Sequence, residues 1–119
     1  MKFKIAGKEY ELKFGMKFIR QLDISKGVDY QGAEFGLGLH LAFMELLQYN
    51  PTVLTDIIQA AVSHEAKVKQ KDVDEAIEQY AEENDGLESL FEGFKEELGK
   101  SPVTKATLRH IQKNARVQN

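Results

Sequence analysis

The spacing of hydrophobic residues predicts helices over most of this 119-residue chain. Apolar side chains recur three and four positions apart, which places them on one face of a helix. The sets with this spacing are Phe14, Phe18, Ile19 and Leu22, ending before Gly27; Val73, Ala76, Ile77, Tyr80 and Ala81; and Leu87, Leu90, Phe91, Phe94 and Leu98. Two further stretches, 34–48 and 51–64, are apolar along most of their length. The sequence therefore predicts a mainly α fold, a small helical domain.

Residues 1–14 instead predict a short N-terminal β-hairpin, because apolar and polar residues alternate there. Gly7-Lys8 is the predicted two-residue loop, since glycine supplies the positive φ that a type II′ turn needs at its first central position. The pairs in this register are Ala6 with Glu9, Ile5 with Tyr10, Lys4 with Glu11 and Phe3 with Leu12. We expect the following helix to cover the hairpin, because an isolated hairpin is marginally stable in water. Residues 27–34 are rich in turn-forming residues and predict a loop.

The stretch 34–48 carries apolar side chains on two opposite sides of its predicted helix. They are Phe35, Leu39, Ala42 and Leu46 on one side, and Leu37, Leu41 and Met44 on the other. A helix that is apolar all round is normally buried, or it contacts two different surfaces. The second side is therefore a candidate either for the core or for a surface that binds another chain.

Asn50-Pro51 separates this helix from the next one. Asn50 is predicted as the N-cap and Pro51 as the first helical residue, where its missing N–H leaves no hydrogen bond unmade. Helix 51–64 then presents Leu54 and Ile58, with other apolar residues, on one side. Because the connection is short, we expect the two helices to form an antiparallel hairpin.

The length of the chain indicates a single domain over residues 1–119. Within it we expect the β-hairpin at 1–14, a helical body at 15–111 and a flexible basic tail at 112–119. The large apolar residues near the C-terminus are Val103, Leu108 and Ile111. The sequence there predicts a weak helix that frays into the tail.

The charges are unevenly distributed along the chain. Residues 71–99 contain eleven acidic and two basic residues, a net charge of −9, whereas residues 100–119 contain five basic residues and no acidic one. The basic tail could neutralise the acidic block. Alternatively, both groups of charges could simply lie on helix faces that are exposed to water, which would produce the same uneven distribution. Nucleic-acid binding is disfavoured, because no aromatic residue is interleaved with the basic ones and the rest of the chain is acidic.

The composition predicts a soluble cytoplasmic protein. The chain has no cysteine, which excludes disulfides, thiolate metal sites and cysteine nucleophiles. Its first residues alternate charged and apolar side chains, unlike a signal peptide. No apolar run reaches the length that spans a bilayer, so we expect no membrane association.

The motifs of common catalytic and metal sites are missing. His40, His64 and His110 are far apart and lack the paired spacing of a metal site. The segment "DVDEAIEQYAEE" begins like a calcium-binding loop, but Ile77 occupies the position that requires glycine. The glycines of "GAEFGLG" are not followed by the Lys-Ser/Thr pair of a phosphate-binding loop. We therefore predict no metal site, no cofactor and no enzymatic activity.

The ordered set of elements resembles the tail assembly chaperones of long-tailed phages that infect Gram-positive bacteria. The segments that carry the resemblance are "FKIAGKEYELKFG" running into "MKFIRQLD", the helix restart "NPTVLTDIIQAAV", and "KDVDEAIEQYAEENDGLESLFEGFKEELGKSP". The resemblance extends over nearly the whole chain.

This resemblance implies a non-enzymatic role in the host cytoplasm. Members of the family keep the phage tape measure protein soluble until the tail tube assembles around it, and they tend to self-associate into homo-oligomers. A small helical protein with an apolar groove can cover an amphipathic helix of such a partner. The expected groove residues are Leu37, Leu41, Met44, Leu54 and Ile58. Two alternatives stay open: a helical adaptor or regulatory protein, and a nucleic-acid-binding protein acting through the basic tail.

Overall fold

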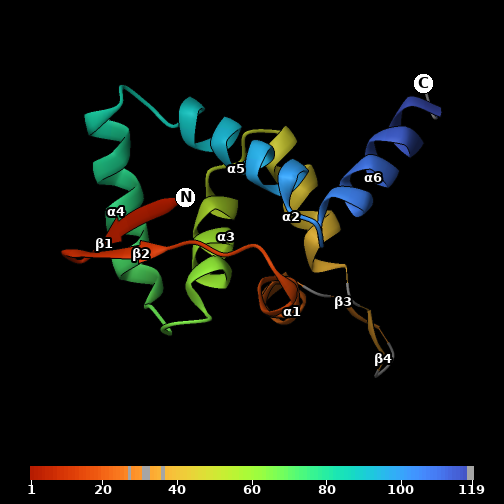
Figure 1. The fold of residues 1–119 in the computed structure, drawn as a ribbon, viewed down its shortest axis with the longest axis horizontal. Coiled ribbons are helices and arrows are strands. Elements are labelled where there is room, and N and C mark those ends of the chain that lie inside the picture. The colour runs from red at the N-terminus through yellow and green to blue at the C-terminus, as the bar shows by residue number, and fades with distance from the viewer. Residues whose placement is uncertain (27, 31–32, 36, 118–119) are drawn as a thin grey trace.

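The computed structural model describes residues 1–26, 28–30, 33–35 and 37–117. Helices make up most of this part of the chain, with one hairpin at the N-terminus and another between the first two helices (Figure 1). The elements are β1 (Lys2–Ile5), β2 (Lys8–Glu11), α1 (Met16–Lys26), β3 (Val28–Tyr30), β4 (Ala33–Phe35), α2 (Gly38–Leu47), α3 (Thr52–Val62), α4 (Gln70–Glu83), α5 (Glu88–Lys100) and α6 (Lys105–Val117). The predicted mainly α fold with a short N-terminal β-hairpin is confirmed.

The first hairpin turns at Ala6-Gly7, so the predicted Gly7-Lys8 loop is wrong. β1 and β2 are antiparallel, and Ile5 pairs with Lys8. Both turn residues have positive φ, 50° at Ala6 and 83° at Gly7, as a type I′ turn requires. This turn type is favoured in hairpins because its twist matches the right-handed twist of the flanking strands.

The observed register differs from the predicted one by two residues. Phe3 pairs with Tyr10 instead of Leu12. Because side chains alternate with a period of two, this shift leaves every side chain on its predicted face. Phe3 and Leu12 are both buried, and Lys4 still lies opposite a glutamate, now Glu9.

The hairpin packs mainly against α4 and α3, whereas we expected α1 to cover it. The rings of Phe3 and Tyr80 of α4 are stacked, with their centroids 6.1 Å apart. After β2 the chain follows α3, where the Lys13 N–H donates to the Ala61 carbonyl at 3.0 Å. Figure 1 shows both strands beside α4 and α3 and the chain reaching α1 only afterwards.

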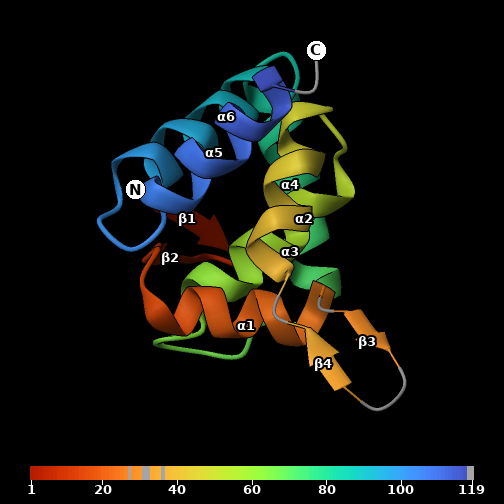
Figure 2. The ribbon, with the colours of Figure 1, turned by 90° about the vertical axis from the view of Figure 1, so that its right-hand side faces the viewer.

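Two short strands, β3 and β4, form where residues 28–30 and 33–34 were predicted as part of a loop, so that prediction is wrong for these residues. β3 and β4 are antiparallel, and Val28 pairs with Phe35. Residues 27 and 31–32 of the predicted loop lie outside the described residues. The hairpin projects from the helical body at the C-terminal end of α1 (Figure 2). Each strand has three residues, which is too short for an alternating apolar pattern to be recognised in the sequence.

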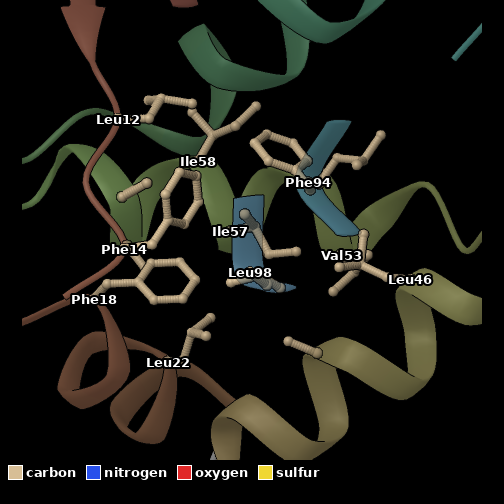
Figure 3. Close-up of a cluster of buried hydrophobic side chains, with 14 of the residues drawn as sticks. Leu12, Phe14, Phe18, Leu22, Leu46, Val53, Ile57, Ile58, Phe94 and Leu98 are labelled. Atoms are coloured by element: carbon tan, nitrogen blue, oxygen red, sulfur yellow. The ribbon is translucent and has the colours of Figure 1, made fainter. Parts of the chain in front are cut away.

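α3 is enclosed by the other helices. Its buried residues are Val53, Leu54, Thr55, Ile57, Ile58, Ala60, Ala61 and Val62. α1, α2 and α4 all pack against it. Figure 3 shows the core that results, in which Leu12, Phe14, Phe18, Leu22, Leu46, Val53, Ile57, Ile58, Phe94 and Leu98 meet. The core therefore joins the segment after β2 to α1, α2, α3 and α5.

α3 begins at Thr52, directly after the break at Asn50-Pro51, so Pro51 and not the predicted Asn50 lies at the N-cap position. The Asn50 side-chain oxygen accepts hydrogen bonds from the Thr52 N–H at 3.2 Å and from the Thr52 hydroxyl at 3.0 Å. It thus satisfies an N–H that the first turn of a helix would leave unpaired. The chain turns back here, and α3 runs opposite to α2 (Figure 1).

α6 packs against α2 and α5, at the opposite end of the longest axis from α4 (Figure 1). Leu108 is buried in this contact. The Thr104 hydroxyl donates to the Leu98 carbonyl at 2.6 Å, which fixes the corner between α5 and α6. The helix continues to Val117 and so enters the segment 112–119, whose flexibility stays a prediction.

Candidate partner-binding surface

α2 has a buried face and an exposed apolar face. The buried residues are Gly38, Leu39, Ala42, Phe43 and Leu46. On the other side, the exposed fractions are 40% for Leu37, 43% for Met44 and 45% for Leu47, and Leu41 is half-buried. We call these four residues, Leu37, Leu41, Met44 and Leu47, the α2 stripe. Single exposed apolar side chains are common, but a contiguous group on one helix is typical of an interaction surface.

The N-terminus of α2 lies directly against the backbone of α1. A Cβ on Gly38 would come within 2.3 Å of the Leu22 carbonyl carbon and oxygen. Backbone atoms cannot move aside, so glycine is required at this position. The Gly38 N–H donates to Asp23 Oδ1 at 3.0 Å, which satisfies one of the unpaired N–H groups of the first turn. α2 therefore begins at Gly38. The predicted start at residue 34 is wrong.

Ion pairs connect α2 to the neighbouring helices α1 and α3. Lys26 Nζ lies 2.9 Å from Glu45 Oε1 and 3.1 Å from Asp56 Oδ2. Burial tends to lower the pKa of Lys26, but the hydrogen bonds and charges of the two carboxylates outweigh it, and the pKa is raised. These contacts join α1, α2 and α3, and so they hold α2 in one rotation about its axis.

Tyr49 attaches the C-terminal end of α2 to α5. The Tyr49 hydroxyl donates to Glu92 Oε2 at 2.7 Å, and its ring stacks on Phe91 with the centroids 4.8 Å apart. The hydrogen bond to Glu92 raises the pKa of Tyr49 to about 12. The pKa of Glu92 is lowered, first by its hydrogen bond with Lys95 and then by that with Tyr49. With both ends of α2 held, the α2 stripe faces outward.

Leu54 and Ile58 do not belong to this surface. Both side chains are 0% exposed in the structure, because α3 has helices on several sides. The expectation that they line an open groove is therefore corrected: they are core residues. Leu37, Leu41 and Met44 do lie together on the outer face of α2, and their role in binding stays a proposal.

Sequence reasoning missed Leu47 and Tyr49. Leu47 follows Met44 by three positions, so helical spacing alone could have placed it beside the exposed side. Tyr49 lies after the end of α2, with a positive φ of 54°. A non-glycine residue in this conformation has no reliable sequence signal.

The acidic residues of α4 form no ion pairs within the part of the chain that the structure describes. They are Asp72, Asp74, Glu75, Glu78, Glu82 and Glu83. Asp74 accepts a hydrogen bond from the Thr55 hydroxyl at 2.5 Å. Because α6 lies at the other end of the molecule, its basic residues do not neutralise this face (Figure 1).

The three histidines lie apart and have different surroundings. His40 Nδ1 is buried in α2 and lacks a hydrogen-bond partner among the described residues. His64 Nε2 lies 2.8 Å from the Glu11 carbonyl oxygen, to which it can donate, and His110 Nε2 lies 3.1 Å from Asn114 Nδ2. Residues 1–26, 28–30, 33–35 and 37–117 contain no group of three His, Asp or Glu side chains placed to hold a metal ion.

Comparison with known families decides the class of protein. The family described as "Phage tail assembly chaperone protein, TAC" has a sequence model that matches residues 2–113. The chain belongs to this family. No curated protein and no solved structure matches it. For a tail assembly chaperone, the α2 stripe is the candidate surface for contact with a tail protein. None of the helices in the described part of this chaperone has the length and apolar character needed to cross a membrane.

Proposed function

We propose that this tail assembly chaperone binds the phage tape measure protein and shields an apolar helical segment of it before the tail tube assembles. The observation that carries the proposal is the α2 stripe, a row of exposed and half-buried apolar side chains on a helix whose opposite side is buried. An amphipathic helix of the partner can lay its apolar face along such a row. The role is binding, not catalysis, and its place is the host cytoplasm, where tails are assembled.

The mechanism is burial of apolar surface on both proteins. A long apolar helix exposed to water tends to aggregate, and covering it removes that surface from solvent. Met44 suits this task, because its flexible thioether side chain adapts to differently shaped partners. Binding driven by apolar area should persist at moderate salt, since screening weakens only the ionic part.

Self-association, which the resemblance implies, can use the same stripe. In the absence of the tape measure protein, a second copy is able to cover Leu37 and Met44, and the partner would then displace it. The mass of the purified chain, measured by light scattering, should exceed that of a monomer. Met44→Asp should shift it toward the monomer, because a charge on this surface opposes burial.

Co-expression with the tape measure protein of the same phage tests the proposal. The unmodified chain should raise the soluble yield of the partner and co-purify with it. Leu37→Asp and Met44→Asp should fold normally by circular dichroism and lose the partner. Met16→Asp is the matched control: Met16 is 51% exposed, close to the 43% of Met44, but it lies in the first turn of α1.

Two results would contradict the proposal in different ways. If the folded Leu37→Asp and Met44→Asp chains still solubilise the partner, the α2 stripe is not the binding surface. If the unmodified chain fails to bind the tape measure protein, that protein is not the partner. A loss of binding by Met16→Asp as large as that by Met44→Asp would also argue against a localised surface.

A further inference from the structure

A cleft of about 560 Å³ lies between α2, α5 and α6, next to the α2 stripe. Leu47 belongs to both, since it lines the cleft and is 45% exposed. Phe43 and Leu108 also line it, but they are almost fully buried. Figure 2 shows α6 beside α5, with α2 next to them. A helix lying on the α2 stripe would therefore have one edge at this cleft.

The two charged walls of the cleft are not equivalent. On the α5 wall, Glu92 is paired with Lys95, and Glu96 is paired with Lys100. On the α6 wall, Lys105 and Arg109 are exposed. Neither of these two cations is paired with a carboxylate in residues 1–26, 28–30, 33–35 and 37–117. The cleft thus carries uncompensated positive charge, although the whole chain has a net charge of −3.

We infer that the helix bound on the α2 stripe has an acidic edge, and that Lys105 and Arg109 receive this edge in the cleft. The inference rests on the proposed function and names the chemistry of its partner segment: an apolar stripe flanked on one side by Asp or Glu. Lys105 and Arg109 are four positions apart, so they lie on the same side of α6. They can meet carboxylates that are themselves one turn apart on the partner helix.

Nucleic acid is a poorer occupant of this cleft than a helix. Phe43, the aromatic residue among those that line the cleft, is 1% exposed, so the lining offers no accessible ring for base stacking. The acidic face of α4 at the opposite end would repel a long polyanion. Charge pairs at an exposed rim contribute little affinity each, and their main effect is on orientation and selectivity. The cations should therefore select the partner segment while the α2 stripe supplies most of the binding.

Two labelled synthetic helices test the inference. Both carry the same Leu stripe, and one has Glu and the other Lys along the flanking edge. By fluorescence anisotropy at low salt, the unmodified chain should bind the Glu helix about threefold to tenfold more tightly than the Lys helix. The double variant Lys105→Glu/Arg109→Glu should reverse this preference. It should fold, because both side chains are exposed and neither forms an ion pair among the described residues. An acidic residue at position 105, in the first turn of α6, also suits the helix dipole.

The control is the double variant Lys67→Glu/Lys69→Glu, which makes the same change in net charge at two exposed lysines between α3 and α4. It should keep the preference for the Glu helix. An unchanged preference in Lys105→Glu/Arg109→Glu would overturn the inference, as would an equal shift in the control, which would indicate an effect of net charge alone. Displacement of the Glu helix by duplex DNA at lower concentration than by unlabelled Glu helix would assign the cleft to nucleic acid and overturn it too.

Binding of the tape measure protein itself separates this inference from the proposed function. If the unmodified chain prefers the Glu helix but does not bind the tape measure protein, the proposed function fails and the charge preference of the cleft holds. If the chain binds the tape measure protein and Lys105→Glu/Arg109→Glu binds it equally well, the proposed function holds and the inference fails.

Discussion

The Gly38 N–H donates a hydrogen bond to Asp23 Oδ1 at 3.0 Å, so a side chain of α1 caps the first turn of α2. At the same point the α-carbon of Gly38 lies so close to Leu22 that no side chain fits between them. The contact fixes where α2 begins and which of its sides faces α1. The outward direction of the α2 stripe depends on it.

Replacing Gly38 with alanine should destabilise the protein. The new Cβ would lie 2.3 Å from backbone atoms of Leu22, and separating α1 from α2 should cost about 2 kcal/mol. Gly99→Ala is the control, since a Cβ there meets nothing within 4 Å. It lies inside α5, where alanine should stabilise by about 0.5–1 kcal/mol. Urea unfolding measures both, and equal effects of the two changes would contradict the close approach.

Substitutions at the two turn positions of the first hairpin should change the stability of the protein in opposite directions. Ala6→Asn should stabilise by up to about 1 kcal/mol, because Asn-Gly is the preferred pair for a type I′ turn and alanine is strained at positive φ. Gly7→Val should destabilise by about 1–2 kcal/mol, since a β-branched residue fits poorly there. Thermal unfolding of both variants checks the turn. A loss of stability in Ala6→Asn would mean that the turn is not at Ala6-Gly7.

The hydrogen bond between Tyr49 and Glu92 should make stability fall at alkaline pH. Because the pKa of Tyr49 is raised from 10.0 to about 12 on folding, its contribution is fully present below pH 10 and is lost as the pH rises toward 12. Between about pH 10 and pH 12, the unmodified chain should lose more stability than Tyr49→Phe. Tyr10→Phe should behave like the unmodified chain. Parallel pH profiles for all three proteins would show that the bond does not form in solution.

Deletion of residues 112–119 should leave both folding and partner binding intact. Leu108 and Ile111, which pack against the core, are kept, and Gln112, Lys113 and Asn114 are exposed. The melting temperature and the co-purification of the tape measure protein should therefore be unchanged. A salt-sensitive complex with DNA that disappears on this deletion would instead support the nucleic-acid alternative, because phosphate contacts depend steeply on ionic strength.

Periodicity and local chemistry determined much of the fold. The helical spacing of Phe18 and Leu22, of Val73 and Ile77, and of the apolar residues in α5 predicted which faces are buried, because a helix exposes its apolar stripe only at a cost. The Asn50-Pro51 break predicted the start of α3 to within one residue, since the start of a helix depends on residues that are near in sequence. Helical spacing also predicted that the helix now seen as α2 has two apolar sides.

Tertiary structure decided which of these sides is free. Leu54 and Met44 are both apolar residues on an apolar side of a predicted helix. In the structure, however, Leu54 is 0% exposed and Met44 is 43% exposed. Periodicity defines a face but does not say whether a neighbour covers it, and α3 is enclosed whereas α2 lies at the edge. The hairpin shows the same limit, because a register shift of two residues keeps every side chain on its face and so leaves the pattern unchanged. Only contacts between distant segments, such as Asp23 with Gly38 and Tyr49 with Glu92, set the rotation of α2 and turned its second apolar side into a surface.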